Sequence, residues 1–124
     1  MLHEFEARYA GQRFPYCEEL FDGLRTGAVQ LASSPRSDSS LTCGHYARVY
    51  RVRMQSARER SGPYWSEIAD AMERLCTELE QTRDEPCELW ALHSHEREYV
   101  VFGIPARQVI AGCLRLKIQR GQPR

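Results

Sequence analysis

The sequence predicts an α+β fold of two layers, in which a mainly antiparallel sheet of about 4-5 strands carries two main helices packed on one face. Three observations support this class. Two apolar blocks enclose a short polar segment around residue 95, a proline at residue 63 opens a long stretch with helical spacing, and candidate strands and helices are interleaved along the chain.

The segment 87–104 holds the densest apolar run of the chain. Its blocks 89–92 and 99–102 flank polar residues, which predicts two antiparallel strands joined by a turn within 94–98. Apolar side chains follow one another in both blocks, so each strand would be apolar on both faces. Such strands are covered on both faces or lie in the centre of a sheet. We therefore expect the rest of the chain to pack around this hairpin.

The first third of the chain predicts a strand, a helix and a loop. Residues 2–9 alternate between apolar and charged side chains, as half-buried strands do. Pro15 suits a first helical position, and helical spacing then continues over 15–26, with Gly27 as the stop. Residues 28–32 fit either a short strand or a further turn of helix. The serine-rich segment 33–40 predicts a mobile surface loop that is able to order on a partner.

Residues 41–55 form the second strong strand prediction. Tyr50, Val52 and Met54 alternate there with Arg51 and Arg53. We expect the arginine side of this strand to face solvent.

Pro63 opens the best helix prediction, over 63–81, which must end before Pro86. We expect its apolar stripe, beginning at Trp65, to lie on the hairpin, and Trp65→Ala to cost about 2–5 kcal/mol. Beyond the hairpin, the spacing fits either a helix or a strand. We favour a helix at 105–111 followed by a strand at 113–119, and then a basic polar tail at 119–124.

Length and composition limit the class of protein. At 124 residues, the chain predicts a single compact domain that needs no disulfide or metal to fold. It has no apolar run of membrane-spanning length and no apolar core of a secretory signal near residue 1, so we expect no membrane association and a cytoplasmic protein. Five scattered cysteines are typical of reduced, buried thiols. The lack of Asn, with sixteen Arg against one Lys, is typical of a GC-rich bacterial or phage genome.

The formal net charge is zero, but the charges are segregated. Segment 67–88 carries eight acids and two Arg, segment 48–60 carries five Arg and one acid, and segment 107–124 carries five basic residues and no acid. These regions would face different partners or would face each other.

Two short motifs are candidates for a metal site or a nucleophile. His93 and His95, with Cys87 and either Cys43 or His45, are residue types that bind zinc, but no further ligand follows at a recognisable spacing. Cys43 and His45 also resemble a thiol nucleophile beside a histidine. We interpret the histidines as the polar end of a hairpin and Cys43 as a buried cysteine. Since there is also no phosphate loop and no nucleophile elbow, we predict no catalytic residue, no metal and no cofactor.

Aromatic and basic side chains are mixed in the predicted strand 41–55. Sheet faces of this composition can stack bases and contact phosphates. They give an alternative function, a nucleic-acid-binding regulator. Its candidate residues are Tyr46, Arg48, Tyr50, Arg51 and Arg53.

The broadest feature is the acidic face of the helix 63–81, which is either a solvated surface or a docking surface for a partner protein. We predict a small non-enzymatic protein-binding regulator or inhibitor, of the immunity-protein or phage anti-defence type, that acts by steric occlusion of its partner. The candidate partner-binding residues are Glu67, Asp70, Glu73, Arg74, Glu78, His93, His95 and Arg97. A homodimer is a further option, and a metal- or thiol-dependent enzyme is the third alternative.

Overall fold

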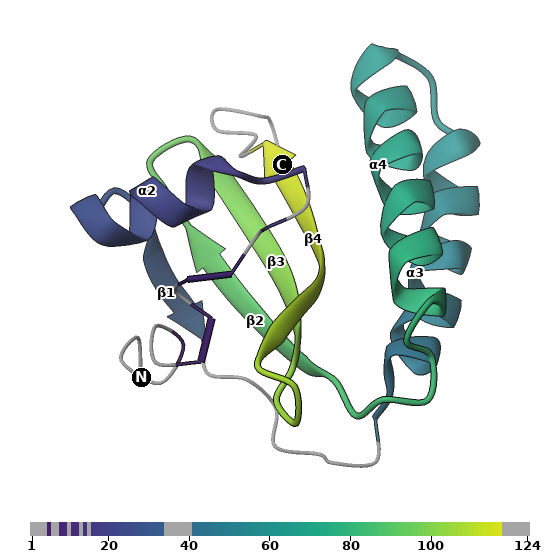
Figure 1. The fold of residues 1–124 in the computed structure, drawn as a ribbon. Helices are drawn as coiled ribbons and strands as arrows, with labels where there is room; N and C mark the ends of the chain where they lie inside the picture. Colours follow the sequence, from purple (N-terminus) through teal and green to yellow (C-terminus); the bar gives the residue numbers. More distant parts are fainter. Residues whose placement is uncertain are drawn as a thin grey trace.

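The computed structural model describes residues Phe5, Arg8, Tyr9, Gly11, Gln12, Phe14, 16–33 and 41–117. The elements in chain order are α2 (Glu19–Thr26), β1 (Gln30–Ser33), α3 (Cys43–Arg58), α4 (Pro63–Glu80), β2 (Glu88–His93), β3 (Arg97–Ile104) and β4 (Val109–Lys117) (Figure 1). The predicted α+β class is confirmed. Among the described helices, none is both long and apolar enough to cross a membrane.

The strands pair antiparallel in the order β1-β2-β3-β4, so each lies beside the next strand along the chain. β2 and β3 form the predicted hairpin, with Leu89 opposite Phe102. A hydrogen bond of 2.8 Å from the Ser94 amide to the carbonyl oxygen of Arg97 closes the turn. The hairpin is therefore confirmed, and its strands are longer than the two apolar blocks.

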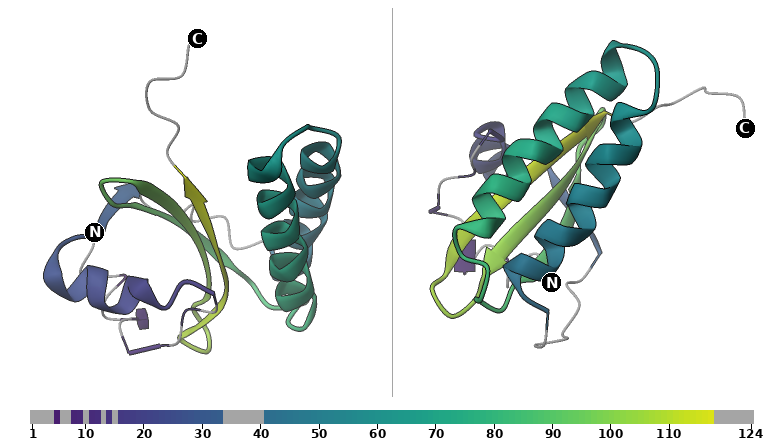
Figure 2. Two further views of the ribbon diagram at one scale, coloured as in Figure 1. Left: turned by 90° about the horizontal axis from the view of Figure 1, so that it is seen from above. Right: turned by 90° about the vertical axis from the view of Figure 1, so that its right-hand side faces the viewer.

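Both faces of the sheet are covered, as the apolar character of both hairpin faces predicts (Figure 2). Trp90 and Leu92 pack with Leu20 of α2. Phe102 and Leu114 belong to the cluster on the opposite face, where α3 and α4 lie. Two main helices do share one face, but they are α3 and α4, whereas the predicted helix at 15–26, observed as α2, lies on the opposite face. The sheet is thus the middle of three layers.

α2 begins later than predicted and ends as predicted. Its first residue is Glu19, and Gly27 follows the last turn with a left-handed backbone, at φ 82°. Glycine adopts this conformation without the steric cost that a side chain brings, so Gly27 is the helix stop. For residues 28–32 the sequence allowed either a short strand or a further turn of helix. The structure has a strand, β1, from Gln30 onward.

The prediction of a strand at 2–9 is wrong at the positions described there. Phe5, Arg8 and Tyr9 have helical backbone, and Phe5 and Tyr9, four residues apart, are both fully buried. Residues at this spacing share one face of a helix. The remainder of that prediction lies outside the described residues, as do most of the loop 33–40 and the tail 119–124.

α3 corrects the predicted strand at 41–55. The alternation of Tyr50, Val52 and Met54 suggested a strand, but in a helix the first and last of these share a face and the middle one does not. Tyr50 and Met54 are accordingly buried, and Val52 is 66% exposed. Thr42 caps the helix, because its hydroxyl accepts a hydrogen bond of 3.1 Å from the His45 amide.

α4 confirms the predicted helix, with Pro63 in its first position. Leu75 and Leu79 carry its buried stripe onto the sheet. Trp65, near the start of α4, is only partly buried, in a cluster formed mainly by α3 and α4. The prediction that the whole stripe packs on the hairpin is therefore wrong at Trp65.

The predicted helix at 105–111 is wrong, because the chain turns after β3 and enters β4 earlier than expected. The predicted strand at 113–119 is confirmed as far as the described residues extend. Gly112 does not break the strand. A Cβ at this position would lie 2.7 Å from Cδ1 of Leu75, so the glycine lets α4 approach β4 closely.

Candidate protein-binding cleft

A cleft of about 820 Å³ opens beside β4. Four parts of the chain line it: α4, β4, the turn between β2 and β3, and the segment that precedes α2. The helix contributes the apolar surface of Tyr64, Ile68 and Ala71. The cleft therefore combines an apolar helix face with the side of a strand.

The cleft runs along the outer edge of β4. Cys113, Leu114 and Arg115 are consecutive in β4 and all line it, although consecutive strand residues point to opposite faces. Only a cleft that reaches around the strand edge meets all three. β4 is the last strand of the sheet, and in the described residues no strand pairs with its outer edge. The backbone groups on this edge are thus a possible pairing site.

The charged side chains of the cleft are divided between its walls. α4 contributes Glu67, Asp70 and Arg74, whereas the β2–β3 turn and the strands contribute Glu96, Arg97, Arg115 and Lys117. An acidic wall therefore faces a more basic one. A ligand with both signs of charge would match this arrangement better than a ligand with one sign.

Arg115 is held in place by α2. Its guanidinium bonds the Glu19 carboxylate at 2.7 Å, and the Tyr99 hydroxyl donates to the same carboxylate oxygen at 3.1 Å. Burial alone would raise the pKa of Glu19, but these hydrogen bonds and the charge of Arg115 hold it below its usual value. The basic wall is therefore anchored to the layer beneath it.

The structure brings together part of the predicted partner-binding set. The residues that line the cleft are Glu67, Asp70, Arg74, His95 and Arg97. Glu73, Glu78 and His93 do not line it. His93 ends β2 opposite Gln30 of β1, and Glu78 is partly buried.

The predicted acidic face of α4 is partly neutralised from within the chain. Arg58 of α3 bonds both Asp70 and Glu73, each at 3.3 Å. The sequence left open whether the acidic and basic segments face different partners or face each other. This part of the acidic segment faces the basic segment of the same protein. Glu67 lies on the same face of α4 and lines the cleft. It forms no ion pair with any of the described side chains.

Sequence reasoning did not assign ten of the fifteen residues that line the cleft, and four of these ten stand out. Tyr16 precedes α2 and is 53% exposed, and Tyr64 starts the apolar helix wall. Arg115 and Lys117 alternate with leucines in β4, a pattern that was visible but was considered only as part of a basic stretch. The exposure of Tyr16 follows from tertiary packing, and no local pattern predicts it.

The candidate nucleic-acid surface is not formed. Tyr46 and Tyr50 lie in α3 rather than on a strand, and both rings are buried against Phe102, at 5.2 and 5.4 Å between centroids. They are not available to stack on bases. The arginines of that set are exposed on α3 and include Arg53, which lies over the Tyr50 ring at 4.8 Å. The set therefore reduces to its arginines, Arg48, Arg51 and Arg53.

The histidine and cysteine motifs do not converge. In the described part of the chain, no group of three or more His, Cys, Asp or Glu side chains is placed to hold a metal ion. The ring of His45 packs on Tyr46 at 5.4 Å. Cys43 begins α3 and is fully buried, in agreement with its interpretation as a buried cysteine.

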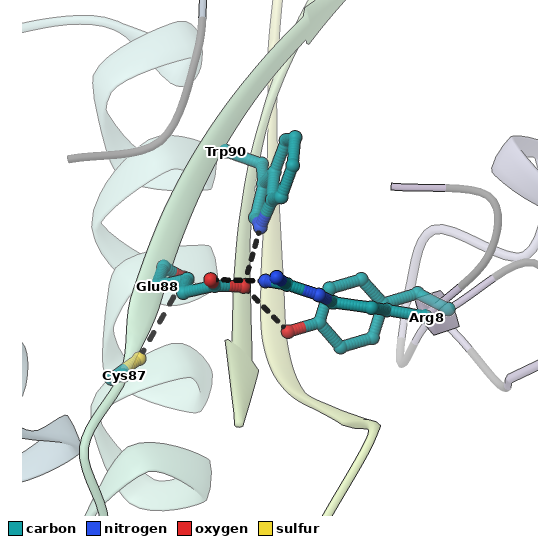
Figure 3. A network of polar contacts seen from close by, with 5 residues as sticks. Arg8, Cys87, Glu88 and Trp90 are labelled. Carbon is teal, nitrogen blue, oxygen red and sulfur yellow. Dashed lines mark hydrogen bonds and ion pairs between the residues drawn. The ribbon is translucent and has the colours of Figure 1, made fainter. Parts of the chain in front are cut away.

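A second polar cluster centres on Glu88, the first residue of β2 (Figure 3). Its carboxylate accepts hydrogen bonds from the Tyr9 hydroxyl at 2.8 Å and from Nε1 of Trp90 at 3.2 Å, and it pairs with Arg8. Burial, then the bond to Glu88, raises the pKa of Tyr9 above its usual range. All of these polar groups are matched with one another, so we interpret the cluster as a tie between the chain start and the sheet.

Comparison of the chain with protein-family models, with curated proteins and with solved structures gives no significant match.

Proposed function

We propose that this protein is a small non-enzymatic regulator or inhibitor that holds an extended segment of a partner protein in the β4 cleft. The observation that carries the proposal is the position of the cleft along the outer edge of β4, which pairs with no strand in the part of the chain that the structure describes. Protein edges of this kind bind extended peptides by adding them to the sheet as a further strand. The cleft also unites Glu67, Arg74 and Arg97, which the sequence singled out as contact residues.

Strand addition suits the shape of the walls. Backbone hydrogen bonds along β4 would supply affinity, and the alternating side chains of the bound segment would point in turn to the two walls. On one side they would meet the apolar surface of Ile68 and Ala71 with the carboxylate of Glu67. On the other they would meet Arg97 and Lys117. The preferred segment therefore carries apolar residues with a basic residue toward α4 and an acidic residue toward β3.

The mechanism would be steric. A partner segment paired along β4 is unavailable for the partner's own contacts, and the helical layer next to the cleft blocks the surface beside it. This action matches the immunity-protein or phage anti-defence type of regulator that the sequence suggests. We also propose a cytoplasmic location, because all five cysteines are free and buried.

A selection from a random peptide library displayed on phage tests the proposal, followed by binding of the selected peptides to the purified chain. We expect selected peptides to slow hydrogen exchange at amides of β4. We expect Arg97→Glu and Glu67→Lys each to weaken binding by about tenfold, in line with the loss of a contact at a charged rim. The matched controls are Arg48→Glu and Glu59→Lys, which make the same charge changes at exposed positions outside the cleft.

Two outcomes would reject the proposal. One is a selection that returns no peptide with measurable binding. The other is protection confined to α3 or β1, with binding that is equally sensitive to Arg48→Glu and to Arg97→Glu.

The nucleic-acid alternative keeps only the exposed arginines of α3 after the burial of both tyrosines. Binding through these arginines would be weak and strongly dependent on salt. Fluorescence anisotropy with single-stranded and duplex probes at about 50 mM salt tests it. Affinity that falls with Arg51→Ala, and not with Arg97→Glu, would favour this alternative over the cleft.

A further inference from the structure

Cys43 and Cys87 meet where the helical layer joins the sheet. Cys43 is the first residue of α3, and Cys87 immediately precedes β2. The segments around them are joined by hydrogen bonds of 3.0 Å from the Cys43 amide to the carbonyl of Glu85 and from the Cys87 amide to that of Leu41. The chain between the two cysteines forms the whole α3–α4 hairpin.

The fold brings this junction together tightly. The Gly44 amide donates to the carbonyl oxygen of Arg83 at 2.9 Å, and a Cβ on Gly44 would lie 3.0 Å from that oxygen. The turn after α4 thus packs directly on the start of α3. The side chains of Cys43 and Cys87 are 0% and 5% exposed, so they are enclosed at this contact.

The two thiols form one proton-sharing unit. The Cys87 thiol lies within reach of both the carbonyl oxygen of Glu88, to which it donates at 3.8 Å, and the Cys43 sulfur. Donation to the Cys43 sulfur lowers the pKa of Cys43 to about 7. Burial opposes this shift and the Thr82 hydroxyl assists it. The same hydrogen bond, then burial, raises the pKa of Cys87, so Cys87 keeps its proton. A thiolate at a helix N-terminus is further stabilised by the helix dipole.

The neighbouring groups act on the two thiols in both directions. The Thr82 hydroxyl is buried without a hydrogen-bond partner in the described part of the chain, and it lies near enough to Cys43 to help lower the pKa of that thiol. Glu85 faces Cys43 and Glu88 faces Cys87, and each opposes a negative sulfur. Arg107 offsets the charge of Glu85 through an ion pair of 2.6 Å.

We propose that Cys43 and Cys87 are a redox-active dithiol that hydrogen peroxide converts to a disulfide. The Cys43 thiolate attacks one peroxide oxygen, the O–O bond breaks, and the departing hydroxide takes a proton to become water. Cys87 then attacks the resulting sulfenic acid, the S–S bond forms, and the sulfenic oxygen leaves as a second water. Two thiols are oxidised and one peroxide is reduced. A small oxidant is required because both sulfurs are enclosed.

The disulfide would join the first residue of the helical hairpin to the residue before β2. It would close a loop that contains all of α3 and α4, which restricts the unfolded chain. We therefore expect the oxidised protein to melt several degrees higher than the reduced protein. The Cys43–Cys87 disulfide would be independent of the β4 cleft, because neither cysteine lines that cleft.

The test is peptide mapping of the full chain after treatment with one equivalent of hydrogen peroxide. Cleavage at arginine and lysine places each of the five cysteines in a separate peptide. We expect the first disulfide to join peptides 37–48 and 84–97. Because the pKa of Cys43 is about 7, the rate at which this disulfide forms should rise about tenfold from pH 6 to pH 8 and then level off.

The competing pair supplies a control within the same molecule. Cys17 and Cys113 form a second pair, in which burial, then the contact with Cys17, raises the pKa of Cys113. Cys43, in contrast, begins a helix and has a lowered pKa, so we expect the Cys43–Cys87 pair to oxidise first. The variant Cys17→Ser should leave the 37–48 to 84–97 cross-link unchanged, and Cys43→Ser should abolish it. Two outcomes in the unmodified chain would overturn the proposal. One is that the first disulfide joins Cys17 and Cys113, and the other is that the rate of disulfide formation keeps rising above pH 8. Neither outcome depends on the folding of a variant.

Discussion

The guanidinium of Arg74 lies over the ring of Tyr16, 4.8 Å from its centroid. Arg74 belongs to α4 and Tyr16 to the segment before α2, so the contact joins the two outer layers past the edge of the sheet. Both residues line the β4 cleft. The contact therefore sets how far apart the walls stand at this point.

Removal of Tyr16 should loosen the cleft at little cost to the fold. We expect Tyr16→Ala to lower the free energy of unfolding by about 0.5–1 kcal/mol, the usual range for an exposed cation–π pair. Peptides selected for the cleft should bind more weakly to the variant. The matched control is Arg60→Ala, which removes a similar contact of 4.3 Å with Trp65 away from the cleft. Equal effects of the two variants on peptide binding would contradict this role for Tyr16.

Gly103 should not tolerate a side chain. A Cβ at Gly103 would overlap the ring of Tyr9, which is fully buried and bonds Glu88. We expect Gly103→Ala to destabilise the protein by about 1–3 kcal/mol, because overpacking displaces the ring. Urea denaturation measures this loss. Gly11→Ala is the control, since a Cβ there would meet no atom within 4 Å, and a similar loss in both variants would refute the steric explanation.

The two tryptophans should differ sharply in their contribution to stability. Trp90 is fully buried beneath α2, so we expect Trp90→Ala to cost about 3–5 kcal/mol. Trp65 is partly buried at the end of the helical hairpin, and Trp65→Ala should cost clearly less. This order replaces the expectation from sequence that Trp65 is a costly core position. Denaturation midpoints of the two variants at one temperature decide between the two views.

The Glu19–Arg115 pair should make stability depend on pH on the acidic side. The pKa of Glu19 is lowered in the folded state, so the contribution of the pair is fully present above the ordinary pKa of 4.5. It is lost as the pH falls from there through the lowered pKa of the folded state. Since the pair is partly exposed, we expect Arg115→Gln to cost about 0.5–1 kcal/mol at neutral pH.

The same cost should be smaller at about pH 3, where Glu19 is protonated in the unfolded chain, and it vanishes only below the lowered pKa of folded Glu19. Denaturation curves at the two pH values measure this difference. Arg25→Gln is the control, because its pair with Asp22 is more than 70% exposed on both sides and should contribute little at either pH. A cost for Arg115→Gln that is the same at both pH values would show that Glu19 is not responsible.

The elements with strong local patterns were predictable from the sequence. The hairpin and α4 carry long apolar periods with clear end signals, and both are confirmed. The strand predicted at 41–55 failed because Tyr50, Val52 and Met54 satisfy a period of two over a short distance, whereas the helical period appears only over the whole of α3.

The candidate site was predictable only in part, because it depends on how the layers meet. Glu67 and Arg97 were identified as exposed charges, but no local pattern indicates that α4 and the β2–β3 turn face each other across β4. The bond between Tyr9 and Glu88 joins positions far apart in the chain, and the apolar pattern around each residue gives no sign of the other. Such pairs follow from tertiary packing, which a single sequence does not encode in its spacing.

The order of the sheet has a consequence for how the chain folds. α3 packs on α4, and β2, β3 and β4 pair in sequence order, so these contacts close only short stretches of chain and should form fast. Tyr9 and Leu20, in contrast, must reach strands that come much later in the chain. We therefore expect docking of the N-terminal segment to be the slow kinetic step. Trp90, which that segment covers, should report this step in stopped-flow fluorescence after the helical circular-dichroism signal has appeared.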